Sequence, residues 1–330
     1  MENVSGKSFI GIVDFSQEAK WLYLSHSVSD ILGYEPEELR GTPSLDLVHP
    51  DEMERVRILH YETIKQDKAA CLVYIRMKHK DSDKGYVLCG VSRTIVHNVT
   101  VGSVSFASSG SALHNASTAQ EITVISPTPE LEFRRWHDPS PMPKQLEVSF
   151  EDTSAEKTPF TYDPLPSQSF RTALILERFS IHCPVLYCSN SLLITATNVD
   201  GRPFFDFVAK KDEEIVRSWI DTVKGWGVNE RGQPSDGGFG FAKFKLLPEG
   251  RDYLHGDRPA EIDPPNHRRG TSHPHVPSRS TQSRSARGQG ADITRPSRRT
   301  TASSEGDSFL VDAIFSAHSD GIVVILRRAS

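Results

Sequence analysis

Short apolar runs separated by polar turns follow one another along the first 125 residues of the chain. Many of these runs are rich in β-branched residues, which is typical of β-strands. The pattern predicts strands at residues 9–13, 21–24, 71–77, 86–96, 101–106 and 121–125.

Three helices are predicted between the second and third of these strands. Residues 25–32 end at Gly33, and glycine best tolerates the left-handed backbone that follows a helix. Residues 36–39 begin at Pro36, which is favoured at the first helical position. Residues 51–65 carry a one-sided apolar stripe. The stripe consists of Met53, Val56, Leu59 and Ile64. This order of elements predicts an α+β unit with the helices gathered on one face of a sheet.

A stretch near residue 41 is repeated near residue 201. Residues 41–48 read GTPSLDLV and residues 201–208 read GRPFFDFV, so glycine, proline, aspartate and the apolar spacing are shared. The match continues in the same frame to Arg57 and Arg217. Two copies with a long period indicate a tandem of domains and not a solenoid.

The second copy begins near Thr172 and repeats the pattern of strands and one amphipathic helix. Its predicted strands cover residues 174–176, 185–187, 240–247, 309–315 and 321–326. The long gap between the predicted strands at 240–247 and 309–315 is rich in Pro, Ser, Arg and Gly. Such a segment cannot bury enough apolar surface to offset the entropy lost on ordering. We therefore predict a disordered insertion there.

The predicted organisation has four segments. A first domain covers residues 5–126, a proline-rich linker covers 127–170, and a second domain covers 171–328, interrupted by a disordered basic insertion at about 249–307.

Composition narrows the class of protein. The chain has 330 residues, a net charge of −5 and a mean hydropathy of −0.42. This length favours two or three domains, and the charge gives no general reason to expect nucleic acid. No apolar run approaches the roughly 18 residues of a membrane span. We expect a soluble cytoplasmic or nuclear protein without membrane contact.

Catalytic and metal-binding motifs are missing from the sequence. The four cysteines are scattered and form no Cys-x-x-Cys pair, so neither a disulfide framework nor a zinc finger is predicted. No phosphate-binding loop, nucleophile elbow or zincin helix occurs. We predict a protein that is not an enzyme and holds no metal.

Residues 32–41, LGYEPEELRG, and residues 48–52, VHPDE, resemble a PAS domain. Residues 201–208 resemble the same part of that fold. With residues 119–125 and 133–136, the chain resembles fungal PAS proteins related to the white collar group. The resemblance implies two PAS-type domains, each an antiparallel sheet with short helices on one face.

Two departures from the white collar pattern limit what the resemblance implies. White collar photoreceptors carry an Asn-Cys-Arg-Phe-Leu-Gln motif whose cysteine forms a flavin adduct, whereas residues 41–44 and 201–204 of this chain hold no cysteine. Those proteins also have a GATA-type zinc finger, which is missing here. We therefore predict neither adduct photochemistry nor direct DNA binding.

Aromatic residues gather around the second copy of the repeat. In a PAS fold this region faces the cavity between helices and sheet, so they are candidate contacts for a small ligand. Packing in the core is the favoured interpretation, because aromatic residues dominate ordinary cores. The candidates are Phe204, Phe205, Phe207 and Trp219.

The cofactor is left open by the sequence. Non-covalent flavin is compatible with a PAS cavity. His60 lies on the longer helix of the first copy, where some PAS domains place a haem ligand, but a lone histidine is weak evidence. We interpret His60 as a surface or core residue and do not predict haem.

The basic stretch 266–303 holds eight arginines and one acid, Asp292. An unstructured spacer, a nuclear-import or nucleic-acid-contacting tail and a phosphorylation target all remain open. A spacer with regulatory phosphorylation is favoured, and Thr301 is the candidate site.

The sequence thus predicts a signalling or regulatory protein. Its tandem PAS domains would bind other PAS proteins or a second copy, in light- or environment-responsive control of transcription. The alternative is a sensor that holds flavin or another small molecule non-covalently in one PAS cavity.

Overall fold

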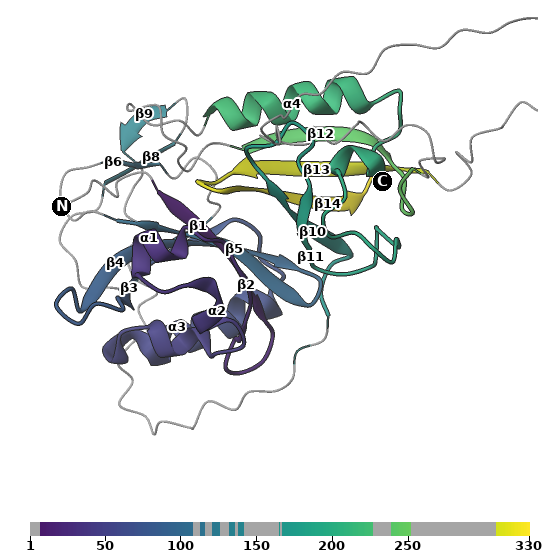
Figure 1. Cartoon of the computed structure of the whole chain (residues 1–330). Coiled ribbons are helices and arrows are strands. Elements are labelled where there is room, and N and C mark those ends of the chain that lie inside the picture. Colours follow the sequence, from purple (N-terminus) through teal and green to yellow (C-terminus); the bar gives the residue numbers. More distant parts are fainter. Residues whose placement is uncertain are drawn as a thin grey trace, which may run out of the picture. The chain divides into compact units, whose positions relative to one another are not determined.

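The computed structural model describes residues 7–107, 113–115, 121–125, 132–135, 138–141, 165, 167–226, 239–251 and 308–330 (Figure 1). Within these ranges the chain forms two larger sheets and one three-stranded sheet. The small sheet consists of β6 (Leu113–Asn115), β8 (Glu132–Arg135) and β9 (Asp138–Pro141). Two of its strands lie within the segment 127–170 that the sequence predicts as a linker.

The first domain contains a six-stranded sheet in the order β2-β1-β5-β4-β3-β7. All six strands predicted from the sequence are present, with bounds that differ by at most two residues. The elements are β1 (Ser8–Asp14), β2 (Trp21–Leu24), α1 (Val28–Leu32), α2 (Pro36–Leu39), the 3-10 helix η1 (Ser44–Leu47), α3 (Pro50–Lys65), β3 (Cys71–Lys78), β4 (Tyr86–Val96), β5 (Val99–Phe106) and β7 (Glu121–Val124).

One strand departs from the predicted antiparallel sheet. β7 pairs with β3 in parallel, with Cys71 opposite Glu121, whereas the other pairs of this sheet are antiparallel. Parallel neighbours cannot be joined by a tight hairpin and require a crossover connection. The residues of β7 alone could not reveal this direction, because strand propensity is the same for both.

Local signals fix the helices. Gly33 ends α1 with φ of 79°, in the left-handed conformation expected of it. Pro36 begins α2, and Glu35 and Glu38 form a reciprocal capping box. α1 starts three residues later than predicted, because the Ser25 side chain accepts a hydrogen bond from the Ile10 N–H and holds a turn.

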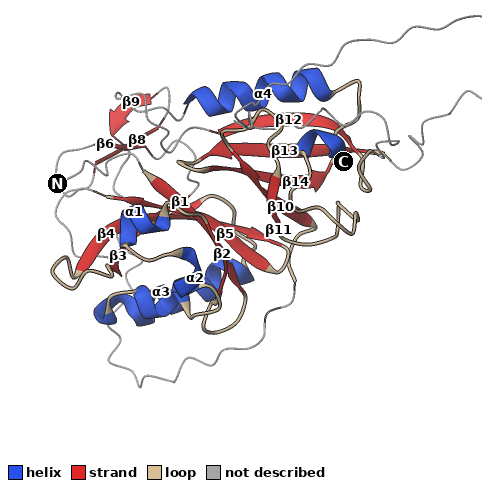
Figure 2. Ribbon diagram, viewed as in Figure 1, coloured by secondary structure: helices blue, strands red, loops and turns tan. Residues whose placement is uncertain are grey.

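The second domain repeats the strand order of the first. Its five-stranded sheet runs β11-β10-β14-β13-β12, which corresponds to β2-β1-β5-β4-β3 (Figure 2). One long helix and a 3-10 helix lie between the second and third strands. The elements are β10 (Arg171–Glu177), β11 (Val185–Cys188), the 3-10 helix η2 (Phe204–Phe207), α4 (Glu213–Trp226), β12 (Phe239–Leu246), β13 (Phe309–Ala317) and β14 (Gly321–Arg328).

The sequence repeat is also a structural repeat. Gly41 and Gly201 have φ of 81° and 78°, and each begins the approach to a 3-10 helix. The Gly41 N–H donates to the Trp21 carbonyl at 2.8 Å, and the Gly201 N–H donates to the Val185 carbonyl at 2.7 Å. The shared glycine therefore serves the same purpose twice: it turns the chain back onto the second strand of its sheet.

Each larger sheet has its own apolar core, in which the helices cover one face. A third apolar cluster combines residues of both sheets, including Ile10 and Ile12 of β1 with Ile175 of β10 and Val323 of β14. The Ser8 N–H also donates to the Ser319 Oγ at 2.8 Å. Both sheets belong to one compact unit.

Residues 252–307 of the predicted disordered insertion lie outside the described residues, so its disorder stays a prediction. Among the described helices, none has both the length and the apolar character that crossing a bilayer requires.

Candidate functional site

The first domain contains a partly open cavity of about 90 Å³ between its helices and the inner face of its sheet. Apolar side chains such as Val56, Val73 and Val104 form much of its wall. Six side chains with polar atoms also line it: Trp21, Ser44, His60, Ser92, Arg93 and Thr100.

Two neighbouring glycines lie on the inner face of the sheet. Gly11 of β1 is opposite Gly102 of β5, and Gly102 is opposite Arg93 of β4, so the three positions form one row across the strands. A Cβ at Gly11 would lie 2.6 Å from the Trp21 ring. Both glycines line the cavity together with Arg93 and the Trp21 ring.

Five buried polar atoms on four of these residues lack hydrogen-bond partners among the described residues. The atoms are Trp21 Nε1, His60 Nε2, Arg93 Nε, Arg93 Nη2 and Thr100 Oγ1. They account for five of the seven buried side-chain nitrogen and oxygen atoms without a partner in the described part of the chain. Buried polar groups in native proteins are nearly always hydrogen-bonded, so this concentration points to a site that accepts a ligand or water.

Arg93 places a positive charge in this apolar surrounding. Its side chain is 9% exposed, and burial lowers its pKa to about 10, so it remains protonated at neutral pH. The nearby Cys71 does not neutralise it, because burial raises the pKa of that thiol. Glu121 also acts on Arg93 electrostatically, but it forms its ion pair with Lys68 at 2.6 Å. The guanidinium therefore has no contacting counter-ion among the described residues.

His60 is uncharged in this environment. Burial, followed by the charge of Arg93, lowers its pKa to about 3. The residue lies on α3 and is 6% exposed, so of the two predicted interpretations, surface or core, the structure supports the core. A neutral imidazole offers one donor and one acceptor, and its tautomer decides which of these Nε2 presents.

The substitution Thr100→Val tests whether the Thr100 hydroxyl lacks a hydrogen-bond partner. We expect Thr100→Val to stabilise the ligand-free chain by about 1 kcal/mol, because a buried hydroxyl without a partner is replaced by a methyl group of similar shape. Thr172 is the matched control, because it is fully buried and its Oγ1 donates to Asn190 Oδ1 at 2.7 Å. Thr172→Val should destabilise by about 1 kcal/mol or more. Urea denaturation measures the change in stability of each variant. A change of the same sign in both would contradict the assignment of the Thr100 hydroxyl as unpaired.

A family profile described as the PAS fold matches residues 22–98. This segment runs from β2 to the end of β4 and includes His60 and Arg93. The chain contains a PAS fold domain. The search of curated proteins returned no match.

Solved PAS domains resemble part of the chain. The PAS domain of the Cronobacter turicensis RpfR quorum-sensing receptor, in complex with BDSF, is 17% identical, with a TM-score of 0.28 over 31% of this chain and 95% of that chain. The Drosophila melanogaster Cycle PAS-B domain with bound ethylene glycol is 17% identical, with a TM-score of 0.26 over 30% of this chain and 99% of that chain. The N-terminal domain of a Marinobacter aquaeolei diguanylate cyclase with a PAS/PAC sensor is 15% identical, with a TM-score of 0.27 over 30% of this chain and 94% of that chain.

The aromatic candidates of the second domain lie apart from the PAS domain cavity. Phe204 and Phe207 are fully buried, Phe205 is 4% exposed, and Trp219 packs against the same core from a partly buried position. The Phe204 ring meets those of Phe205, Phe244 and Phe315 edge to face. None of the four candidates lines the cavity of about 90 Å³. Ligand binding at these four residues stays a prediction.

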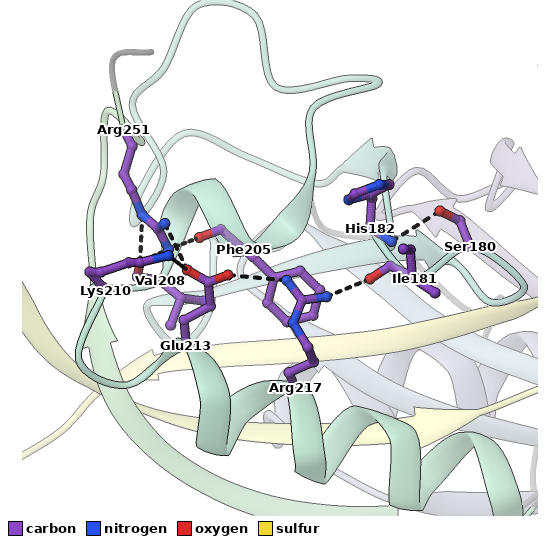
Figure 3. Close-up of polar contacts among 9 residues, drawn as sticks. All are labelled: Ser180, Ile181, His182, Phe205, Val208, Lys210, Glu213, Arg217 and Arg251. Carbon is purple, nitrogen blue, oxygen red and sulfur yellow. Dashed lines mark hydrogen bonds and ion pairs between the residues drawn. The ribbon is translucent and has the colours of Figure 1, made fainter. Parts of the chain in front are cut away.

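A second polar cluster surrounds the start of α4 (Figure 3). The Glu213 carboxylate forms ion pairs with Lys210 at 3.1 Å, Arg217 at 3.1 Å and Arg251 at 2.7 Å. Burial raises the pKa of Glu213, but hydrogen bonds from these three cations outweigh it and lower the pKa to about 2. Arg217 also stacks its guanidinium 3.7 Å from the centre of the Phe205 ring.

Arg251 connects this cluster to the backbone. It donates from Nη2 to the carbonyls of Phe205 at 2.6 Å and Val208 at 2.7 Å. Every charged group of the cluster thus has partners inside the chain, in contrast to Arg93. We assign the Glu213 cluster to the stability of the second domain.

The described residues contain no group of three or more His, Cys, Asp or Glu side chains that could hold a metal ion. Thr301, the candidate phosphorylation site, lies outside the described residues. Its modification stays a prediction.

Proposed function

We propose that the chain is a signalling protein whose PAS domain is a receptor for a small molecule. The observation that carries the proposal is the set of partnerless polar atoms on Trp21, His60, Arg93 and Thr100 around one cavity. Each such atom costs about 1–3 kcal/mol when it is buried without a hydrogen bond. A ligand that supplies the missing partners would remove this cost and so bind to the folded chain.

The size of the cavity restricts what it can hold. Pockets for drug-sized ligands measure roughly 300–1,000 Å³, and this cavity measures about 90 Å³. Flavin and haem are therefore too large for it as formed, although His60 of α3 lines it. The proposed ligand is a molecule of a few non-hydrogen atoms.

Binding would act on the contacts between α3 and the sheet. His60 and Val56 belong to α3, whereas Arg93 and Thr100 belong to β4 and β5, so a ligand bound between them contacts both layers. A ligand that stabilises one arrangement of helix and sheet shifts the population toward it. That shift is the proposed signal.

Analysis of molecules retained by the purified chain tests this function. The chain is denatured in acid, and the released small molecules are identified by NMR and mass spectrometry. The variant Val104→Phe, which fills the cavity from β5, is the comparison. A compound released by the wild type and lost in the variant supports the receptor. A compound retained equally by both would place it outside this cavity and count against the proposal.

Partner binding is the second candidate function, and an exposed apolar patch favours it. Phe241 of β12 is 70% exposed and Ile314 of β13 is 37% exposed, and the two residues are directly opposite each other. Apolar side chains gathered in this way often mark protein contacts. We propose a second copy of the chain as the occupant, and sedimentation of the wild type and of Phe241→Lys tests it. Self-association that is equal in both, or missing from the wild type, counts against it.

The finer points of the function rest on sequence motifs. The second domain, with its matching strand order, is proposed as a second PAS domain. The likeness to white collar proteins, a role in light- or environment-responsive transcription without direct DNA binding, and the lack of catalytic activity are part of the same proposal.

A further inference from the structure

We propose that the ligand of the PAS domain cavity is a small planar oxyanion, such as a short-chain carboxylate, held side-on by Arg93. This inference rests on the proposed receptor function and specifies the class of its ligand.

The partnerless atoms of Arg93 define the geometry. Nε and Nη2 are both without a partner, and these two nitrogens lie on the same edge of the guanidinium plane. That edge presents two parallel N–H groups, which match the two oxygens of a carboxylate. A neutral ligand could occupy one of them, but a planar oxyanion occupies both.

The other polar groups fit the same ligand. The Trp21 Nε1–H is a donor only, and the Thr100 hydroxyl can donate as well as accept. Together with the two N–H groups of Arg93, the residues that line the cavity therefore carry three partnerless groups that donate hydrogen bonds and accept none. A surplus of donors with a positive charge selects an anion over a neutral or cationic molecule.

The positive charge of Arg93 favours an anion over water as the occupant of the cavity. A cavity of this volume and polarity can hold water molecules, which would satisfy the hydrogen bonds. Water does not neutralise the guanidinium, and an uncompensated charge in an apolar surrounding is costly. An anion supplies both hydrogen bonds and charge.

The volume limits the length of the anion. An engineered apolar cavity of about 150 Å³ accepts benzene, with its six ring carbons. In proportion, a cavity of about 90 Å³ suits a ligand of about four non-hydrogen atoms. Acetate, formate, nitrate and bicarbonate fall within this limit, whereas benzoate and longer fatty acids exceed it.

Thermal unfolding and calorimetric titration of the full chain test the inference. The probes are sodium acetate, the neutral analogue acetamide, and sodium benzoate as an oversized anion, at a constant ionic strength set with sodium chloride. The variants are Arg93→Met and Arg93→Lys, and Arg55→Met on the exposed face of α3 is the matched control for the loss of one arginine.

The expected result is a rise of the unfolding temperature with acetate in the wild type and in Arg55→Met. Acetamide and benzoate should produce little change. Arg93→Met should lose the rise of the unfolding temperature with acetate. Arg93→Lys keeps the charge but cannot donate two parallel hydrogen bonds, so it should bind acetate at least about tenfold more weakly. If Arg93→Met does not fold, Arg93→Lys alone decides the point.

Each contrary outcome has a separate meaning. An equal response to acetamide and acetate would overturn the anion and leave the receptor function standing. An undiminished acetate response in both Arg93 variants would place binding elsewhere and overturn the inference. No response to any probe, together with no retained compound, would overturn the inference and the receptor function alike, with water as the occupant.

Discussion

Replacing Gly102 by alanine is expected to destabilise the chain by about 3 kcal/mol, at the upper end of the cost of overpacking. A Cβ at this position would lie 2.0 Å from the carbonyl oxygen of Ser92 on the neighbouring strand β4. Backbone cannot move aside as a flexible side chain can, so β4 and β5 would have to separate where they carry Arg93 and Thr100. The variant should therefore also lose the response to acetate.

Gly225 provides the control for Gly102→Ala. It lies in the last turn of α4, and a Cβ there would have no neighbour within 4 Å. Gly225→Ala should stabilise the chain by up to about 1 kcal/mol, because alanine is the better helix former. Urea denaturation at neutral pH gives both values. A cost below about 1 kcal/mol for Gly102→Ala would show that the sheet does not approach so closely.

Glu213→Gln is expected to destabilise the second domain by about 2 kcal/mol, because charged hydrogen bonds contribute more than neutral ones. The substitution removes the charge that pairs with Lys210, Arg217 and Arg251. The half-buried guanidinium groups of the two arginines then lack a carboxylate partner. The adjacent Glu214 is exposed, so Glu214→Gln should change stability by less than about 0.5 kcal/mol. Equal effects of the two substitutions would contradict the assignment.

The effect of Glu213→Gln should depend on pH. The pKa of Glu213 is lowered from 4.5 to about 2 in the folded chain. A lowered carboxyl pKa contributes stability above the unfolded value and loses it as the pH falls through the folded value. The wild type should therefore exceed the variant in stability at pH 7, and the difference should shrink between pH 4.5 and 2. A difference that stays constant over this range would show that charge is not the cause.

The elements of the fold could be predicted because their signals are local. Gly33 ends α1, Pro36 begins α2, and the apolar runs mark the strands of the first domain to within two residues. The repeat at Gly41 and Gly201 predicted two units with one topology, and both glycines adopt the same left-handed conformation. The parallel pairing of β7 could not be predicted in this way, because it depends on where the chain returns to the sheet.

The cavity depends on contacts across strands and was missed. Gly11, Gly102 and Arg93 are far apart in the sequence, and only the register of β1, β5 and β4 brings them into one row. One signal was present: Arg93 stands at a position where the alternation Cys89, Val91, Ile95 places inward-facing side chains. A charged residue in such a series is a candidate for a ligand contact, because a buried charge needs a partner.

The aromatic candidates lie in the second domain, where the chain arranges its core differently. Phe204 occupies the position of Ser44 in the repeat, and Phe205 that of Leu45. Ser44 and Leu45 line the cavity of the PAS domain. The larger Phe204 ring instead packs against Phe244 and Phe315. The same structural position thus borders a cavity in one domain and fills the core in the other.

Methyl NMR of the full chain during titration with acetate tests the central claim most directly, because it locates the ligand. We expect the methyl signals of Val73 and Val104, which line the cavity, to shift in a saturable manner in the wild type and not in Arg93→Met. Signals of Val185 and Val324 in the core of the second domain should stay in place. Cavity signals that do not move, or shifts confined to the second domain, would contradict it.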